Sequence, residues 1–127
     1  MTGPVAGATA TLTFVVGDHD TAQALGSGDV PVLATPRLVA WAEAATVAAV
    51  ADNLAAGVTT VGIRVEWDHM AASPVGAPVE VTAEVVDVGA REVSFDVTAR
   101  EHGRVVGRGV VRRAVVDRDQ FLSRIHR

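Results

Sequence analysis

Residues 35–56 read TPRLVAWAEAATVAAVADNLAA, and this stretch decides the fold. Thr35 can cap a helix N-terminus, and Pro36 suits the first helical position, where its missing N–H costs nothing. Gly57 stands where such a helix would end. The pattern therefore predicts a helix over residues 36–56, about five to six turns long. Because this helix is apolar over most of its circumference, we expect other elements to wrap around it.

Five stretches of the sequence alternate between apolar and other residues, as strands do. One precedes the predicted helix and four follow it. They cover residues 9–16, 59–68, 79–88, 92–101 and 104–116. Turn signals stand at residues 88–91 and at His102-Gly103, so we expect antiparallel hairpins there. This order predicts an α+β domain in which an antiparallel sheet of about five strands wraps around one long central helix.

Two segments lie outside these elements. Residues 17–34 hold Gly, Asp, Ser and Pro with little periodicity, which predicts a lid-like loop, with a surface excursion as the alternative. Residues 117–127 form a C-terminal tail that is expected either to make a short helix or to fray. Because 127 residues fit a single domain, we expect one domain over residues 1–127. A partner subunit is expected to cover the rest of the sheet.

The composition excludes several classes of protein. A net charge of −4 argues against nucleic acid as the main partner, which normally demands a basic face. The absence of Cys excludes disulfides, thiolate metal sites and a cysteine nucleophile. Residues 1–8 lack the basic and apolar regions of a signal peptide, and no apolar run reaches the roughly 18 residues of a membrane span. We therefore expect a cytoplasmic protein without a membrane partner.

Glu43 is the most informative single residue. On a helical wheel it falls in the middle of an apolar stripe that also holds Val39, Val47, Val50 and Leu54. A buried charge is costly unless something pairs with it. This placement favours a functional carboxylate that acts as acid, base or nucleophile. The alternative is a carboxylate at the helix edge that forms an ion pair or reaches solvent.

His69 closes the second predicted strand, and Gly62 lies within it. His69 is in phase with Ile63, Val65 and Trp67, so without a bulge it faces the same side as they do. Alone, such a His is more often a hydrogen-bonded core residue, but its combination with Glu43 favours proton transfer. Gly62 lets strand backbone approach a ligand closely, or it marks a bulge.

Thr35 has a possible role besides capping. A helix N-terminus offers free N–H groups and a positive dipole end, which stabilise an anion that forms beside it. His19, His102 and His126 fall in the predicted loop, a turn and the tail, and are not candidates. The sequence holds no HExxH spacing, no Ser-centred elbow and no phosphate-binding glycine loop. We therefore expect neither a metal nor a cofactor.

Two stretches together resemble a known family. Residues 34–43 (ATPRLVAWAE) are similar to the lid-to-helix segment of the fluoroacetyl-CoA thioesterase group of hotdog proteins, which place a Thr eight residues before a Glu. Residues 61–74 (VGIRVEWDHMAASP) resemble a later segment of that group, in which a Gly precedes a His by seven residues and small residues and Pro follow. The similarity runs from about Ala10 to Phe121.

The resemblance implies a hotdog fold, a homodimer and hydrolysis of a small acyl-CoA thioester. It assigns the catalytic Thr, Glu and His to Thr35, Glu43 and His69, and a substrate-contacting Gly to Gly62. Glu43 would act as nucleophile or general base, His69 would move protons, and Thr35 would donate to or position the reacting groups. The family enzyme has a longer, Phe-bearing lid, whereas residues 17–34 contain no aromatic side chain. This departure leaves fluoroacetyl selectivity open.

Other functions on the same fold also stay open. One is a non-catalytic protein that binds acyl-CoA or another hydrophobic ligand. A hydratase-type hotdog enzyme is the second, although its usual Asp/His pairing on the helix is not evident. The length of the acyl chain, and the choice between coenzyme A and a carrier protein as thiol, do not follow from the sequence. Four arginines in the last strand are candidates for coenzyme A phosphates, but we interpret them as a solvated strand edge: Arg104, Arg108, Arg112 and Arg113.

Overall fold

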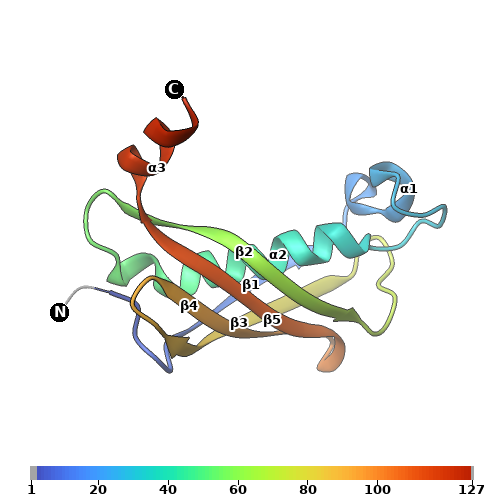
Figure 1. The fold of residues 1–127 in the computed structure, drawn as a ribbon. Helices are drawn as coiled ribbons and strands as arrows, with labels where there is room; N and C mark the ends of the chain where they lie inside the picture. The colour runs from blue at the N-terminus through green and yellow to red at the C-terminus, as the bar shows by residue number, and fades with distance from the viewer. Residues whose placement is uncertain (1–2, 127) are drawn as a thin grey trace.

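One antiparallel sheet curls around a single long helix (Figure 1). The computed structural model describes residues 3–126. Its strands are β1 Thr9–Val15, β2 Val58–His69, β3 Pro78–Val88, β4 Glu92–Glu101 and β5 Arg104–Asp117. Its helices are α1 Ala22–Leu25, α2 Thr35–Val50 and α3 Arg118–Ile125, with short 3-10 turns η1 Asp18–Asp20 and η2 Ala51–Asn53.

The sheet has the order β1-β3-β4-β5-β2, and every neighbouring pair is antiparallel. The predicted fold class is therefore confirmed, and the predicted strands agree with the observed ones to within one residue at either end. Both residues of the β4–β5 turn have positive φ, 49° at His102 and 80° at Gly103, as a two-residue type I′ hairpin requires. The edges of the sheet are β1 and β2.

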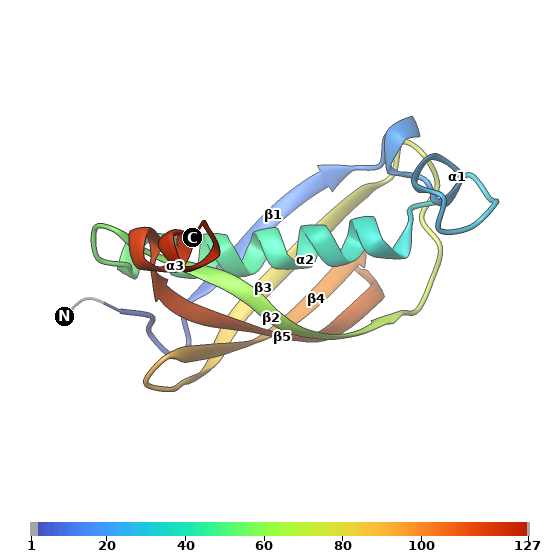
Figure 2. The same ribbon diagram turned by 45° about the horizontal axis from the view of Figure 1, so that its top comes forward.

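The core lies between α2 and the inner face of the sheet. The helix buries Leu38 and Trp41 together with the small residues Ala42, Ala45 and Ala49, which let its backbone approach the strands closely. Alternate residues of β3 and β4 face it and are buried: Val79, Val81, Ala83, Val85, Val93, Phe95, Val97 and Ala99. Each Val or Phe buried in this way contributes about 1.5–3 kcal/mol relative to exposure. Figure 2 shows α2 lying across the concave side of the sheet.

The predicted cap residue and the predicted C-terminal end of the helix are wrong, whereas the predicted start differs from the observed one by a single residue. The N-cap residue is Ala34, which has no capping side chain, and Thr35 is already helical. At the other end α2 stops at Val50 and tightens into η2, because Asp52 and Asn53 favour turns over helix. Gly57 does not end the helix, but turns the chain into β2 with a φ of 79°. The missing cap leaves the Thr35 hydroxyl available for another partner.

A β-bulge in β2 overturns the expected alternation of this strand. The register against β5 shifts between Gly62 and Arg64, so the strand changes face at Ile63. Thr60 points inward before the bulge and Trp67 lies against the core after it, whereas Ile63 remains 49% exposed. The bulge removes the condition under which His69 and Ile63 would share a face, and His69 lies on the helix-facing side together with Trp67.

The predicted loop and tail both carry structure. Residues 17–34 contain η1 and α1 and lie at the N-terminal end of α2, beside the β2–β3 connection (Figures 1 and 2). Backbone hydrogen bonds join the two segments, among them Leu33 N to Ser73 O at 2.9 Å. In the tail, Asp117 caps α3 by accepting from the backbone N–H of Gln120 at 2.9 Å. None of the helices within residues 3–126 has both the length and the apolar character that crossing a bilayer requires.

Candidate active site

Helix α2 and strand β2 run in opposite directions, which brings the predicted site residues together in two pairs. Thr35 at the start of α2 meets His69 at the end of β2. Two turns further along the helix, Glu43 meets Gly62 on the strand. The Cα atoms of Thr35 and Glu43 are eight positions apart, or about 12 Å along the helix axis. Because Cα–Cβ bonds tilt toward the helix N-terminus, Glu43 leans toward Thr35.

The first pair is a hydrogen bond between Thr35 Oγ1 and His69 Nδ1 at 2.7 Å. Burial lowers the pKa of His69 from its usual 6.5, and a hydrogen bond with the backbone of Ala71, which favours the protonated ring as donor, opposes that shift in part. His69 is therefore neutral at pH 7, and its imidazole can accept a proton. Its Nε2 atom is covered and has no hydrogen-bond partner within residues 3–126. Nε2 therefore faces the interior, and Nδ1 is the ring nitrogen that meets Thr35.

The second pair places the Glu43 carboxylate against backbone. A Cβ built on Gly62 would overlap Glu43 Oε2, so any side chain at this position would displace the carboxylate. Gly62 also borders the bulge, and both interpretations of this residue therefore apply. Glu43 is not buried in the middle of an apolar stripe: its side chain is 37% exposed and forms an ion pair with Arg113, as the alternative of a carboxylate at the helix edge predicts. The stripe of Val39, Glu43 and Val47 flanks the core, and the buried face of α2 lies beside it.

Arg113 is a residue of this site that the sequence interpretation missed. It is 7% exposed, and it donates from Nε to Thr60 Oγ1 at 2.8 Å and from an Nη atom to Thr60 O at 3.2 Å. The other Nη atom lies 3.3 Å from Glu43 Oε2. Burial lowers the pKa of Arg113 and Glu43 opposes the shift, but a guanidinium stays charged at any working pH. Arg113 is therefore a fixed cation beside the carboxylate.

The interpretation of Arg113 as part of a solvated edge is wrong, whereas Arg104, Arg108 and Arg112 are exposed. Arg113 is two residues from the buried Val111, and in a strand that spacing places both side chains on the same face. The two-residue spacing from Val111 was therefore the signal in the sequence that could have identified Arg113 as an inward-facing residue. Within the described residues, the Glu43 side chain pairs with Arg113 and the His69 side chain with Thr35.

A cleft of about 380 Å³ opens beside Thr35 and His69. Apart from these two residues and Ser27, its walls are apolar and mostly small. They come from the 17–34 segment and the start of the β2–β3 connection: Ala22, Gly28, Val30, Val32, Leu33, Met70, Ala71 and Ala72. Such a cleft suits a short aliphatic group whose polar end meets the hydroxyl and imidazole.

The remaining candidates lie away from this cleft. His102 occupies the β4–β5 turn, His126 ends α3, and both are exposed. His19 is exposed as well and lies 3.7 Å from Asp20. Across residues 3–126, His, Asp and Glu side chains form no group of three or more that could hold a metal ion. The chemistry of the site therefore comes from a hydroxyl, a neutral imidazole, a carboxylate and a guanidinium.

Known proteins resemble this chain along nearly its whole length. A family model described as fluoroacetyl-CoA-specific thioesterase matches residues 16–119. The fluoroacetyl-CoA thioesterase of Streptantibioticus cattleyicolor is 35% identical over 94 residues, which make up 74% of this chain and 68% of that enzyme. The solved structure of the fluoroacetyl-CoA thioesterase FlK gives a TM-score of 0.90 at 33% identity, over 98% of this chain and 96% of that one.

Two further solved structures extend the comparison. A point mutant of FlK in complex with fluoroacetate and CoA gives a TM-score of 0.84 at 34% identity, over 92% of this chain and 98% of that one. A hot-dog-like protein from Thermanaerovibrio acidaminovorans gives a TM-score of 0.86 at 22% identity, over 94% and 89% of the two chains, and so shares the fold.

Proposed function

Because the chain belongs to the fluoroacetyl-CoA-specific thioesterase family of hotdog proteins, we propose that it hydrolyses a small acyl-CoA thioester. Water and the thioester give the free acid and the thiol of coenzyme A. The observation that carries the proposal is the hydrogen bond between Thr35 and a neutral His69 beside an apolar cleft, with Glu43 two turns further along the same helix. A solved complex of a relative with CoA supports this choice of thiol.

Each polar group has a role that its surroundings suit. Glu43 attacks the thioester carbonyl or takes a proton from the attacking water, since a carboxylate can do either. Arg113 holds this carboxylate, and His69 transfers a proton to the leaving thiolate or from the water. Thr35 orients His69 and donates a hydrogen bond to the reacting group, where the positive end of the α2 dipole favours a developing oxyanion.

The nucleophile and base roles of Glu43 differ in one observable. Attack by the carboxylate breaks the C–S bond, expels the coenzyme A thiolate and forms an acyl anhydride on Glu43, which water then hydrolyses to the free acid, whereas general-base catalysis leaves the enzyme unmodified throughout. Rapid quenching of a single turnover, followed by mass spectrometry of the peptide that holds Glu43, separates them. An added acyl mass supports the covalent route, and its absence during measurable turnover supports the base.

A free-thiol assay over a panel of acyl-CoA substrates tests the proposed reaction. We expect wild type to release thiol and Glu43→Gln to lose at least a hundredfold in kcat, because the amide is neither a base nor a nucleophile. Glu80→Gln, an exposed carboxylate on β3, is the matched control and should retain wild-type rates. Binding of acyl-CoA without release of thiol by wild type would instead identify a non-catalytic binding protein.

We also propose that the protein acts as a homodimer, because edge strand β2 leaves apolar side chains uncovered. Ile63 and Val65 on β2 are 49% and 37% exposed, and Val47 on the neighbouring flank of α2 is 46% exposed. A second copy that pairs with this edge would cover them and narrow the opening beside Glu43. Since coenzyme A thioesters are formed inside cells, we propose a cytoplasmic location, which cell fractionation would test.

A further inference from the structure

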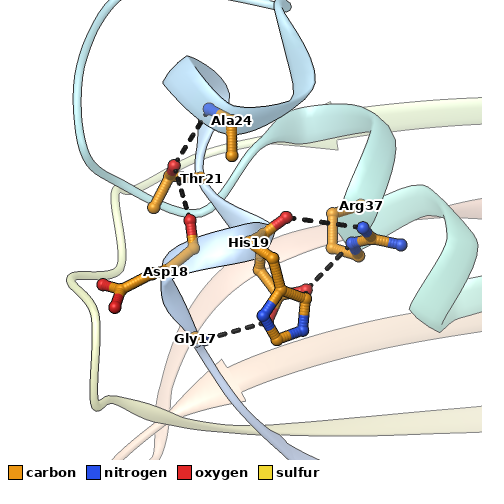
Figure 3. Close-up of polar contacts among 7 residues, drawn as sticks. Gly17, Asp18, His19, Thr21, Ala24 and Arg37 are labelled. Atoms are coloured by element: carbon orange, nitrogen blue, oxygen red, sulfur yellow. Dashed lines mark hydrogen bonds and ion pairs between the residues drawn. The ribbon is translucent and has the colours of Figure 1, made fainter.

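The 17–34 segment is joined to α2 by an ion pair between a buried carboxylate, Asp20, and a guanidinium, Arg37, whose side chain is 31% exposed. The Asp20 residue is only 6% exposed, and its Oδ1 lies 2.9 Å from Arg37 Nε in the first turn of the helix. Figure 3 shows the Arg37 side chain reaching from the helix to the backbone of the segment at His19, whose carbonyl accepts from Arg37 at 3.5 Å. A carboxylate in such a place is costly to bury without a partner, so the pair is a specific connection.

Further hydrogen bonds make Asp20 a rigid junction. Its second carboxylate oxygen accepts from the backbone N–H of Gly17 at 2.8 Å. Its backbone carbonyl accepts from the N–H of Ala34, the N-cap residue of α2, at 2.9 Å. Asp20 is therefore tied to the helix twice, on either side of Thr35, through Ala34 and Arg37. Any movement of Asp20 would reach Thr35 directly.

The contacts of Asp20 also fix the position of the residues that form the cleft wall. Thr21, which follows Asp20, forms a β-bridge with Leu33, which precedes Ala34. Ala22 and Leu33 line the cleft with Thr35 and His69. On its far side the wall is joined to the β2–β3 connection by a bridge from Val32 to Pro74. The distance between the apolar wall and the Thr35 hydroxyl therefore depends on Asp20 and Arg37.

We propose that Asp20 and Arg37 are positioning residues that hold the 17–34 segment as a preformed wall of the acyl cleft, and that the preferred substrates are short aliphatic acyl thioesters. The cleft is lined by small aliphatic side chains and is built before substrate arrives, so each methylene that it covers adds binding without a cost for ordering the wall. This inference rests on the proposed hydrolysis. Neither residue touches the reacting atoms, and both act through the segment and Thr35.

The chain-length dependence of hydrolysis tests the positioning role. Wild type should prefer butyryl-CoA and hexanoyl-CoA to acetyl-CoA in kcat/KM, by up to roughly fourfold for each methylene buried. Arg37→Met keeps the apolar stem without the charge, and Asp20→Asn keeps an acceptor for Gly17. Each variant should lose most of this preference through a higher KM for the longer substrates, with kcat less affected. A purely structural role would lower the melting temperature and leave the preference unchanged.

A second readout needs no turnover. Thermolysin cuts before apolar residues, and the 17–34 segment offers several in or near α1. We expect the segment to resist cleavage in wild type and to be nicked at least tenfold faster in Arg37→Met and Asp20→Asn. Arg108→Met, which removes an exposed cation from β5, is the control and should match wild type in both readouts. A double variant should lose less chain-length preference than the two single losses combined, because both remove one interaction.

The outcomes separate this inference from the proposed function. If wild type releases no thiol from any acyl-CoA, hydrolysis is wrong, and the protease readout alone decides whether the ion pair fixes the segment. If wild type is active but the variants keep its chain-length preference and its resistance to thermolysin, the positioning role is wrong while hydrolysis stands. Should wild type show no preference for longer acyl chains, the assignment of aliphatic substrates to the cleft fails.

Discussion

At the scale of single residues, the site depends on how charged and polar side chains are held. Arg113 is fixed by both the hydroxyl and the carbonyl of Thr60 before it reaches Glu43. A guanidinium that is held at two points loses little further freedom when it binds a third group. Thr60 on β2 therefore acts on Glu43 only indirectly, by holding Arg113 of the neighbouring strand β5.

Replacement of Thr60 tests this indirect role. Thr60→Val keeps the shape of the side chain and removes the acceptor for Arg113 Nε. A hydrogen bond to a charged group contributes about 1.5–3 kcal/mol, so we expect kcat to fall by roughly ten- to a hundredfold. Thr60→Ser keeps the hydroxyl and should retain most of the activity. Equal rates for the Val and Ser variants would show that Arg113 needs no help from Thr60.

The pH dependence of the reaction should follow His69. Because burial disfavours the imidazolium, the pKa of His69 lies below 6.5, and the neutral form is present at pH 7. We expect kcat/KM to be constant above pH 6.5 and to fall as the pH drops through the lowered pKa. Stability should also decline as the pH falls from 6.5 toward that pKa, since the unfolded state binds the proton more readily. The His69→Gln variant should lose the part of the pH dependence that His69 causes, both in kcat/KM and in the free energy of unfolding. Profiles of rate and of urea unfolding against pH would measure this loss.

Sequence patterns identified Thr35, Glu43, His69 and Gly62, and the structure brings them together as two pairs, Thr35 with His69 and Glu43 with Gly62. The pairing itself was not predictable. It depends on Ala34 rather than Thr35 being the cap, and on a bulge beside Gly62, which was only one of two interpretations of that glycine in the sequence. The roles of these four residues remain predictions until their variants are assayed.

At the scale of elements, the fold was largely predictable because strand alternation and turn chemistry agree locally. The end of α2 was not, since helix propensity weakens only gradually through Ala51 and Asp52. The close packing of β5 against β2 and α2 was also hidden. A Cβ built on Gly107 would lie 2.7 Å from the ring of Trp67 and 3.1 Å from Leu38. Glycine is needed there for this approach.

Gly107→Ala should therefore strain the packing of three elements at once. Overpacked methyl groups typically cost about 1–3 kcal/mol, and we expect a loss of that size in the free energy of unfolding. The midpoint of urea unfolding would measure it. Gly89→Ala in the β3–β4 turn is a suitable control, because its Cβ would make only an ordinary contact, 3.4 Å from Glu92 O. Equal midpoints for the two variants would contradict this account of the packing.

At the scale of the whole molecule, the sheet has two edges with different coverage. Edge strand β1 pairs with β3, and its Phe14 ring stacks on Trp41 of α2 at 4.6 Å between ring centroids. Edge strand β2 has apolar side chains at and beyond its bulge that the described chain leaves open. Exposed apolar groups that gather on an unpaired edge favour association with another copy.

A charged substitution on this edge tests the proposed homodimer. Ile63→Glu combined with Val65→Glu would place two unpaired charges in the interface, and this should raise the dissociation constant by on the order of a hundredfold or more. Light scattering after size-exclusion chromatography would then report a monomer where wild type gives a dimer. Val86→Glu, which replaces an exposed Val on β3, should leave the mass of wild type unchanged.

The bridge between Thr21 and Leu33 has a consequence for how enzymes of this shape diversify. It joins the two ends of the loop formed by residues 22–32. This loop can therefore become longer or shorter, or exchange its side chains, while its two ends stay in place. The free energy needed to close a loop grows only with the logarithm of its length, so such changes destabilise the fold little. Selection can thus change the loop that lines the acyl cleft, while the side chains that carry out hydrolysis keep their positions.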